Sequence, residues 1–165
     1  MTASISVVLC CHNSARRLPP TLKHLAAVKV PPGMDWEVLV VDNASTDDTA
    51  ACARTLWAGA GEPAPLRVLS EPRQGLNYAR WAGIRAARGD IISFVDDDNW
   101  VDAGWLEVIT EVFLTEPRVG AVGAWAEPVC DGQIPAWFER VQQLYACGPQ
   151  GPAAGPVPAA RGYLA

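Results

Sequence analysis

The chain has 165 residues, half of them hydrophobic and 19% charged, a composition typical of one globular domain. Its formal net charge of −5 argues against sequence-independent binding of nucleic acid, which requires a basic surface. The N-terminus lacks a basic segment before a long apolar stretch, and no run of about 18 apolar residues occurs, so we expect no signal peptide, no transmembrane segment and a cytoplasmic location.

Apolar runs that end in polar residues or glycine alternate with helical patterns along the chain. The runs predict strands over residues 5–9, 37–41, 66–69, 91–95 and 119–123. Apolar residues at helical spacing predict helices over residues 16–28, 45–58, 75–88, 102–113 and 134–145. Strands that alternate with helices of about 10–14 residues form parallel sheets with helices on both faces. The sequence therefore predicts an α/β fold of three layers, α/β/α, around a mainly parallel sheet.

Ser45 and Asp102 are residue types that cap helix N-termini, and we expect each to cap the helix that follows it. Residues 148–165 are rich in Gly, Pro and Ala without periodicity, which predicts a loop or a disordered tail. We therefore expect one domain over residues 1–147, followed by this tail. Five cysteines without CxxC spacing predict reduced thiols rather than a disulfide framework.

Three consecutive carboxylates, Asp96, Asp97 and Asp98, directly follow the strand expected at residues 91–95. Open α/β sheets bind ligands at the carboxyl ends of their strands. Adjacent like charges repel, which raises the pKa of a carboxyl group unless a cation or hydrogen-bond donors compensate. Clustered carboxylate oxygens suit Mg²⁺ or Mn²⁺, which in turn neutralise a substrate diphosphate. The alternative is a solvated acidic turn before the next helix.

Asp42 ends the second expected strand as Asp96 ends the fourth, so both side chains can face one crevice. An aspartate in that position accepts hydrogen bonds from a nucleotide base or from ribose hydroxyls. The alternative is that Asp42 and Asn43 only form an Asx turn that leads into the next helix.

Loops after two other strands add polar groups at the same edge. Arg73 follows the third strand, and its guanidinium could stack on a base or bind a phosphate. His12 and Asn13 follow the first strand and could donate or accept hydrogen bonds at a base. Taken singly, Arg73 is equally consistent with a solvated loop charge, and His12 with a surface histidine.

Absent motifs exclude other nucleotide enzymes and hydrolases. The chain has no GxGxxG after its first strand and no GxxxxGK[ST], which argues against dinucleotide-binding Rossmann sites and P-loop NTPases. It also lacks GxSxG and HExxH, so hydrolase chemistry of those kinds has no support.

Four ordered blocks resemble the family 2 glycosyltransferases, which adopt the GT-A fold. The blocks are residues 6–13, 40–49, 75–80 and 89–99, so that the resemblance covers about residues 4–123. It implies transfer of a sugar from a nucleotide-diphosphate donor (UDP-, GDP- or dTDP-linked) to an acceptor hydroxyl, with inversion at the anomeric carbon. The acceptor implied is a glycan or a lipid-linked glycan, in polysaccharide or glycan biosynthesis.

The resemblance also assigns roles to residues. Asp42 corresponds to the carboxylate that contacts the base or ribose, with His12, Asn13, Asn43 and Arg73 around the donor nucleotide. The triplet Asp96-Asp97-Asp98 matches the DxD-type motif of the family. Asp98, with Asp96, is implied as the ligand of Mg²⁺ or Mn²⁺, while Asp96 and Asp97 lie nearer the ribose and diphosphate.

The chain departs from the family downstream of this motif. Family members place the general base, an Asp or Glu, well after the DxD-type block, whereas only 67 residues follow Asp98 here. The carboxylates beyond Glu116 are Glu127, Asp131 and Glu139, and none has the sequence context of that base. We therefore expect the N-terminal, donor-binding portion of a longer enzyme, which in its full length could lie at the inner face of the membrane.

Two alternatives differ in chemistry. The chain could bind a nucleotide diphosphate and a metal without catalysis, since the general base and acceptor site are missing. It could instead be a sugar nucleotidyltransferase, but those enzymes carry a glycine-rich loop after the first strand, and residues 10–17 contain no glycine. Hydrolysis of a sugar nucleotide in the absence of an acceptor would separate partial activity from binding alone.

Overall fold

The computed structural model describes residues 3–130, 132–145, 147, 148 and 155. The chain divides into two compact units, Met1–Glu116 and Pro117–Ala165. The expected domain over residues 1–147 stays a prediction, and most of the expected tail over residues 148–165 lies outside the described residues.

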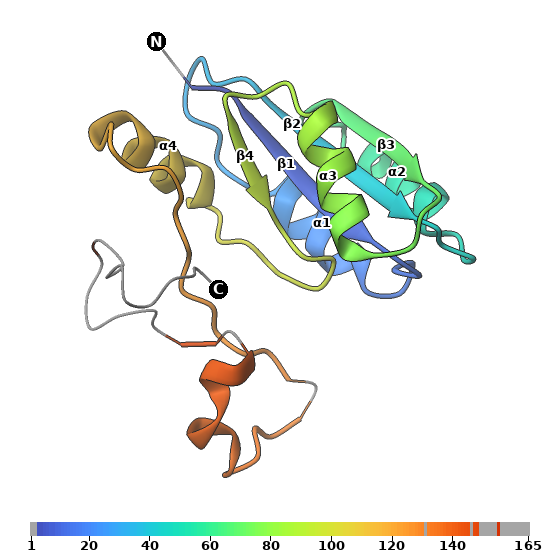
Figure 1. Ribbon diagram of the computed structural model, residues 1–165, viewed down its shortest axis with the longest axis vertical. Helices are drawn as coiled ribbons and strands as arrows, with labels where there is room; N and C mark the ends of the chain where they lie inside the picture. Colours follow the sequence, from blue (N-terminus) through green and yellow to red (C-terminus); the bar gives the residue numbers. More distant parts are fainter. Residues whose placement is uncertain (1–2, 131, 146, 149–154, 156–165) are drawn as a thin grey trace. The chain divides into compact units, whose positions relative to one another are not determined.

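Four parallel strands form the sheet of the first unit, in the order β3-β2-β1-β4 (Figure 1). They are β1 (Ile5–Cys11), β2 (Trp36–Asn43), β3 (Leu66–Glu71) and β4 (Ile91–Phe94). Each strand lies where an apolar run predicted one. The two central strands, β1 and β2, are buried along nearly their whole length, because a parallel sheet with helices on both faces has no solvated side. The parallel α/β prediction is confirmed.

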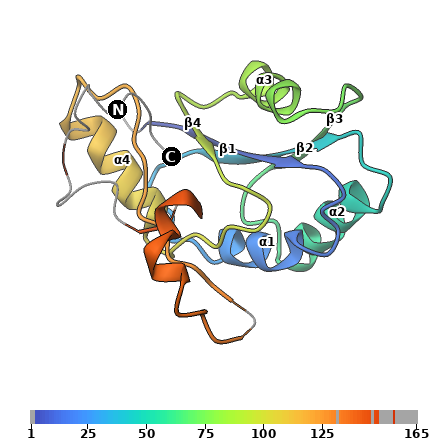
Figure 2. The same ribbon diagram turned by 60° about the horizontal axis from the view of Figure 1, so that its bottom comes forward.

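Helices cover both faces of this sheet, and Figure 2 shows α3 alone on one side with α1 and α2 on the other. The helices of this unit are α1 (Leu18–Ala26), α2 (Thr49–Gly59), α3 (Leu76–Ala86) and α4 (Trp105–Thr115). Leu106 of α4 belongs to the core cluster that also holds Leu18 and Leu25 of α1, so α4 packs on the α1 side. These layers are the predicted α/β/α arrangement.

The core is divided by the sheet into a larger and a smaller cluster. In the larger one the rings of Trp36 and Trp57 meet edge to face, with centroids 6.0 Å apart, and Trp57 Nε1 donates to the carbonyl oxygen of Ala64 at 2.7 Å. The smaller one lies under α3 and contains Val8 and Ala79. This packing places the carboxyl ends of all four strands at one edge.

Both predicted N-caps are wrong. The N-cap of α2 is Asp48, and the Ser45 hydroxyl instead accepts a hydrogen bond from the backbone N–H of Asn13. The N-cap of α4 is Gly104, whose N–H donates to Asp102 Oδ1 at 2.7 Å in the turn ahead of the helix. In each case the polar side chain that could cap the helix accepts a hydrogen bond from a loop N–H instead. Sequence spacing does not distinguish a side chain that caps a helix from one that binds a loop.

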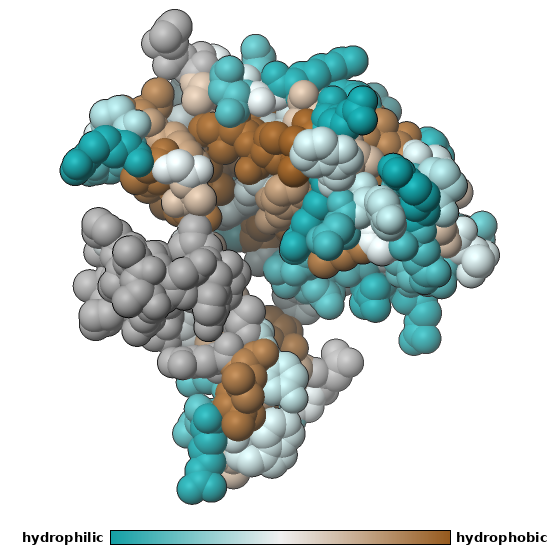
Figure 3. Space-filling view, viewed as in Figure 1, coloured by the Kyte–Doolittle hydropathy of each residue, from teal (hydrophilic) through white to brown (hydrophobic). Residues whose placement is uncertain are grey.

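β4 lies at one edge of the described sheet, and its surroundings are apolar. Figure 3 shows hydrophobic side chains gathered around this strand. Phe94 is 40% exposed, and the guanidinium of Arg80 lies over its ring at 5.7 Å from the centroid. Part of the apolar surface at this edge is therefore open to solvent.

The second unit differs from the sequence prediction. Residues 119–123 form no strand, and the helix expected over residues 134–145 is replaced by two 3₁₀ helices, Phe138–Arg140 and Gln142–Tyr145. Gly120 and Gly123 weaken a strand, and a strand also needs a pairing partner that a local pattern does not reveal. Phe138 contacts both Trp137 and Tyr145, so the aromatic spacing reflects a small cluster. No helix among the described residues is long and apolar enough to cross a bilayer.

Candidate functional site

The strand register brings the loops of interest to one edge of the sheet. Cys11 at the end of β1 lies beside Asp42 of β2, which in turn lies beside Ser70 of β3. His12 therefore follows at the same level as Asn43, and the acidic residues 96–98 follow β4, which pairs with β1 on the other side. The sheet thus places the predicted residues of four separate loops along its carboxyl edge.

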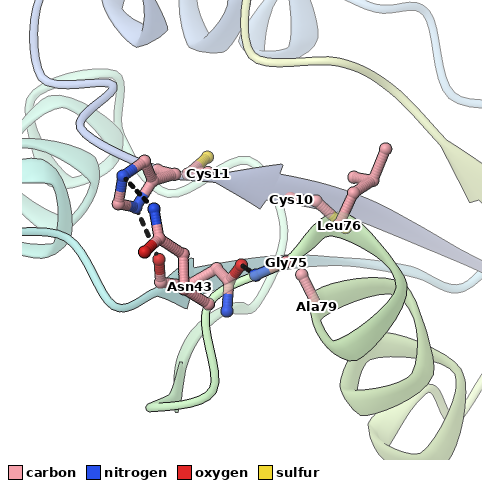
Figure 4. Close-up of a pocket in the computed structure, with 8 residues that line it drawn as sticks. Cys10, Cys11, Asn43, Gly75, Leu76 and Ala79 are labelled. Atoms are coloured by element: carbon pink, nitrogen blue, oxygen red, sulfur yellow. Dashed lines mark hydrogen bonds between the residues drawn. The ribbon is translucent and has the colours of Figure 1, made fainter.

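A pocket of about 200 Å³ opens at this edge, between the ends of β1 and β2 and the N-terminus of α3 (Figure 4). Its lining residues are Cys10, Cys11, His12, Asn43, Gln74, Gly75, Leu76 and Ala79. The lining combines apolar atoms with an imidazole and an amide, which is the mixture found where planar, partly polar ligands bind.

The ring of His12 is held in one tautomer by its neighbours. Nδ1 lies 2.7 Å from the carbonyl oxygen of Asn43 and must donate to it, because a carbonyl only accepts. Nε2 is then the acceptor, and the side-chain Nε2 of Gln74 lies 3.1 Å away as its donor. Both ring nitrogens of His12 are thus bonded within the protein, which fixes the orientation of the ring beside the pocket.

Asn13 joins the loop after β1 to the loop after β2. Its backbone adopts a φ of 51°, a conformation that asparagine tolerates better than most residues. Its Oδ1 accepts a hydrogen bond from the backbone N–H of Thr46 at 2.8 Å, and its own N–H donates to the Ser45 hydroxyl at 3.1 Å. Asp42 is half-buried nearby, and its Oδ1 accepts from the N–H of Ser45 at 3.3 Å.

Asn43 uses its side chain to hold the loop between β3 and α3. Its amide nitrogen donates to the carbonyl oxygens of Glu71 and Arg73, at 3.1 and 2.7 Å, and its oxygen accepts from the N–H of Gly75 at 2.7 Å (Figure 4). The side chain is buried and directed at these backbone groups. Its assignment to the donor nucleotide stays a prediction, while its contacts are those of a loop anchor.

Arg73 is clamped rather than free. Its guanidinium donates to both carboxylate oxygens of Glu71 at 2.8 Å and lies 4.7 Å from the centroid of the Tyr78 ring. These hydrogen bonds lower the pKa of Glu71 to about 2. Because 62% of the arginine side chain remains exposed, it keeps an accessible surface in a fixed orientation.

The three carboxylates of the triplet do not face the same way. Asp97 is buried, with 8% exposed, and accepts hydrogen bonds from the Ser14 hydroxyl and from the Arg17 guanidinium, the latter at 2.8 Å. Asp96 and Asp98 are exposed, and among the described residues their carboxylates form no hydrogen bond or ion pair. The inward position of Asp97 differs from the predicted contact with a ribose or diphosphate, and that assignment stays a prediction.

The donor set at Asp96 and Asp98 fits a hard divalent cation. No group of three or more His, Cys, Asp or Glu side chains that could enclose a metal occurs in the part of the chain that the structure describes. Mg²⁺ commonly binds through one or two carboxylates, with waters and substrate phosphates as the other ligands. Two exposed carboxylates on one turn match that pattern better than an all-protein cage.

The cysteines of the pocket are unsuited to nucleophilic chemistry. Burial raises the pKa of the Cys10 thiol to about 11, and burial also raises the pKa of the Cys11 thiol well above its usual range. Both remain protonated near neutral pH, and only the thiolate is a strong nucleophile or metal ligand. Neither forms a disulfide, and the expectation of reduced thiols stays a prediction.

Sequence reasoning missed four residues of this edge. Gln74 lines the pocket, and Ser14, Arg17 and Thr21 bind the acidic turn through Asp97. Gln74 adjoins Arg73 in the same loop, which is a local signal for it. The other three partners lie 76 to 83 residues from Asp97, so no local pattern links them to it.

Comparison with protein families gives one match that covers most of the chain. The model of the family described as Glycosyl transferase family 2 matches residues 6–146. An uncharacterized glycosyltransferase of Mycobacterium tuberculosis, Rv0539, is 39% identical over 101 residues, which are 61% of this chain and 39% of that protein. The succinoglycan biosynthesis protein ExoM of Rhizobium meliloti is 30% identical over 124 residues, or 74% of this chain and 38% of that protein. The chain thus spans about two fifths of these relatives.

Solved structures share the fold. TarS of S. aureus, whose structures include a complex with UDP-GlcNAc, has a TM-score of 0.67 at 23% identity, covering 82% of this chain and 38% of that one. The mannosyltransferase PcManGT of Pyrobaculum calidifontis, solved with GDP-Man and Mn²⁺, has a TM-score of 0.65 at 29% identity, covering 75% of this chain and 36% of that one. The sheet and its helices therefore have the arrangement found in these two proteins.

Proposed function

The chain belongs to glycosyl transferase family 2, and on this premise we propose that it binds the sugar-nucleotide donor of an enzyme that transfers a sugar to an acceptor hydroxyl. The observation that carries the proposal is the acidic turn at the carboxyl edge of the sheet, where Asp96 and Asp98 are exposed and Asp97 is turned inward. A diphosphate leaving group requires charge neutralisation, and this turn can supply it through a cation.

The donor nucleotide would bind along the edge between the pocket and the acidic turn. Asp42 offers a hydrogen-bond acceptor, the ring of His12 lines the pocket, and the guanidinium of Arg73, held by Glu71, offers a planar cationic surface to a base. Asn13, Asn43 and Asp97 act mainly as loop anchors in this proposal, since their side chains are bonded to other parts of the chain. A UDP-, GDP- or dTDP-linked sugar is the proposed class of donor.

Asp98, together with Asp96, would hold Mg²⁺ or Mn²⁺ against the diphosphate. A bound divalent ion stabilises the negative charge that develops on the leaving diphosphate. The structure of PcManGT with GDP-Man and Mn²⁺ supports a metal of this class. In this proposal the protein's own part is to keep both carboxylates exposed at the turn, free of hydrogen bonds to other described residues.

The family resemblance further supports inversion at the anomeric carbon and a glycan or lipid-linked acceptor. The relationship to ExoM supports a place in polysaccharide biosynthesis. A cytoplasmic site of action, at the inner face of the membrane where the acceptor is lipid-linked, belongs to the same proposal.

A second function, binding of donor and metal without turnover, is favoured by one observation. The carboxylates Glu127 and Glu139 are both exposed without hydrogen-bond partners among the described residues, so no such contact positions either of them as a general base. Hydrolysis of UDP-glucose without an acceptor, followed by release of UDP, distinguishes the two functions. Turnover that is lost in Asp98→Ala supports a sugar-transferring enzyme. Binding of the nucleotide without turnover supports the second function.

Calorimetric titration of UDP, GDP and dTDP, each with and without Mn²⁺, tests the proposed site directly. We expect binding of one nucleotide that requires Mn²⁺ and is lost in Asp98→Ala. Asp35→Asn is the matched control, because Asp35 is an exposed aspartate just before β2, at the opposite edge of the sheet. A folded wild-type sample that binds none of the three nucleotides would refute the proposal for this chain.

A further inference from the structure

One face of α1 contacts the acidic turn at three successive positions. Arg17, Thr21 and His24 are spaced four and three residues apart, which places them on one side of a helix. Arg17 Nη2 donates to Asp97 Oδ2 at 2.8 Å, and Thr21 Oγ1 donates to the backbone carbonyl of Asp97 at 3.0 Å. Residues 97–101 therefore run along this face of α1.

The third contact fixes the far end of the turn. His24 Nδ1 lies 3.3 Å from the carbonyl oxygen of Val101, to which it can only donate. Its ring stacks on Trp100, with centroids 5.5 Å apart and planes 12° from parallel. Beyond the helix, the N–H of Lys29 donates to the carbonyl oxygen of Ala103 at 2.7 Å, so the contact continues to the start of α4.

The turn itself explains why one carboxylate must point inward. The N–H of Asn99 donates to the carbonyl oxygen of Asp96 at 3.2 Å, which makes Asp97 and Asp98 the two central residues of a tight turn. Three neighbouring negative charges repel unless one of them is compensated. Arg17 and the Ser14 hydroxyl compensate Asp97, while Asp96 and Asp98 remain free and exposed.

We infer that Arg17 is a positioning residue for the acidic turn: by holding Asp97 inward it keeps Asp96 and Asp98 in the orientation that binds a divalent cation and a nucleotide diphosphate. This inference rests on the proposed function. Residues that orient metal ligands without touching the metal act by reducing the freedom of those ligands before the metal arrives. Nothing in the sequence around Arg17 marks it for this role.

Arg17 itself lies at the surface, whereas the carboxylate that it binds does not. Its side chain is 54% exposed and that of Asp97 is 11% exposed, so removal of Arg17 leaves the Asp97 carboxylate bonded to the Ser14 hydroxyl alone and without a compensating cation. The pKa of Arg17 is raised by the hydrogen bond to Asp97 and by the charge of the same group, so it stays a cation throughout the pH range of the assay. Removal of Arg17 should therefore disorder the turn and leave the sheet intact.

The test measures Mn²⁺ affinity in the presence of UDP, by calorimetry and by the paramagnetic resonance signal of free Mn²⁺. For Arg17→Met we expect binding weaker by roughly 10- to 100-fold, the range seen when partners of metal ligands are removed. Arg16→Met is the matched control, because Arg16 is the adjacent exposed arginine and forms no side-chain hydrogen bond or ion pair within the described residues. Arg17→Lys should recover part of the loss.

Hydrogen exchange supplies a readout that does not need the metal. Arg17→Met should speed exchange of the backbone amides of residues 97–101 and leave those of β1 and β2 unchanged. A double variant, Arg17→Met with Asp97→Asn, should lose no more affinity than the larger single loss, because both changes break one contact.

Three results obtained with the variants would overturn the inference, and a fourth, with the wild type, would remove its basis. Arg17→Met could bind Mn²⁺ and UDP like the wild type, or Arg16→Met could lose as much affinity, which would indicate a general charge effect. Additive losses in the double variant would show that Arg17 and Asp97 act separately. If the wild-type chain binds no Mn²⁺ with UDP, the proposed function fails first and the inference falls with it.

Discussion

The side-chain oxygen of Asn43 accepts a hydrogen bond from the backbone N–H of Gly75 at 2.7 Å, across 32 residues of sequence. Through this contact the end of β2 holds the start of α3. Gly75 has a φ of 141°, a conformation that L side chains rarely adopt, so the loop needs both the glycine and its anchor. The wall of the pocket therefore depends on a residue whose own side chain is directed into the protein.

Replacing Asn43 by Ala should destabilise the fold and loosen the loop that carries Arg73. The change removes three hydrogen bonds and leaves backbone groups without partners, which costs about 1–3 kcal/mol. Urea unfolding measures the loss. Asn77→Ala is the control, because Asn77 is an exposed asparagine on α3. Equal stability of the two variants would contradict the anchoring role.

Arg73→Ala should change the acid titration of Glu71. The hydrogen bonds from Arg73 hold the pKa of Glu71 at about 2, below the value of about 4.3 expected for an unfolded chain. A lowered pKa stabilises the fold above the unfolded value, and this stabilisation is lost as the pH falls toward 2. NMR titration of the Glu71 carboxyl should show a higher pKa in Arg73→Ala, and Arg80→Ala should leave it unchanged. An unaltered titration in Arg73→Ala would contradict the clamp.

Gly83→Ala should destabilise the packing of α3 on the sheet. A Cβ at this position would lie 2.4 Å from Cγ1 of Val8, closer than real Cβ contacts. Overpacking of this kind outweighs the better helix propensity of alanine, with a net loss of about 1–2 kcal/mol. Gly59→Ala, at the end of α2, is the control, because a Cβ there meets nothing within 4 Å. Thermal unfolding of both variants tests this, and a Gly83→Ala protein as stable as Gly59→Ala would show that α3 is free to move.

Alkylation should distinguish Cys10 from the exposed Cys130. With a pKa of about 11, Cys10 is only about a thousandth thiolate at pH 8, so iodoacetamide should modify it slowly. Peptide mass spectrometry follows both sites. Because Cys10 lines the pocket, UDP with Mn²⁺ should slow its modification further and leave Cys130 unaffected. Protection of neither residue would place the nucleotide away from this pocket.

Local patterns were sufficient for the elements of the first unit. Strands and helices of this unit were predicted to within a few residues, because buried parallel strands are continuous apolar runs and the helices between them are amphipathic. The same reasoning was wrong for residues 119–123 and 134–145, where short apolar patterns did not correspond to a strand or to a long helix. In such segments pairing and packing partners decide the structure, and spacing does not identify them.

Sequence by itself also determined which residues meet at the carboxyl edge, since parallel strands align the loops that follow them. Only the tertiary structure decided which of those residues stay exposed and which are bonded within the protein. Asp96, Asp97 and Asp98 are the same residue type, yet Asp97 alone is buried. Its carboxylate accepts a hydrogen bond at 2.8 Å from Arg17, which lies 80 residues earlier in the sequence. Likewise, Asn43 holds the loop before α3 because backbone carbonyls lie within hydrogen-bonding distance of its side chain. Arg73 is fixed in orientation because its guanidinium donates to the Glu71 carboxylate. Burial and hydrogen-bond partners are properties of the folded chain, so they are absent from any local reading of it.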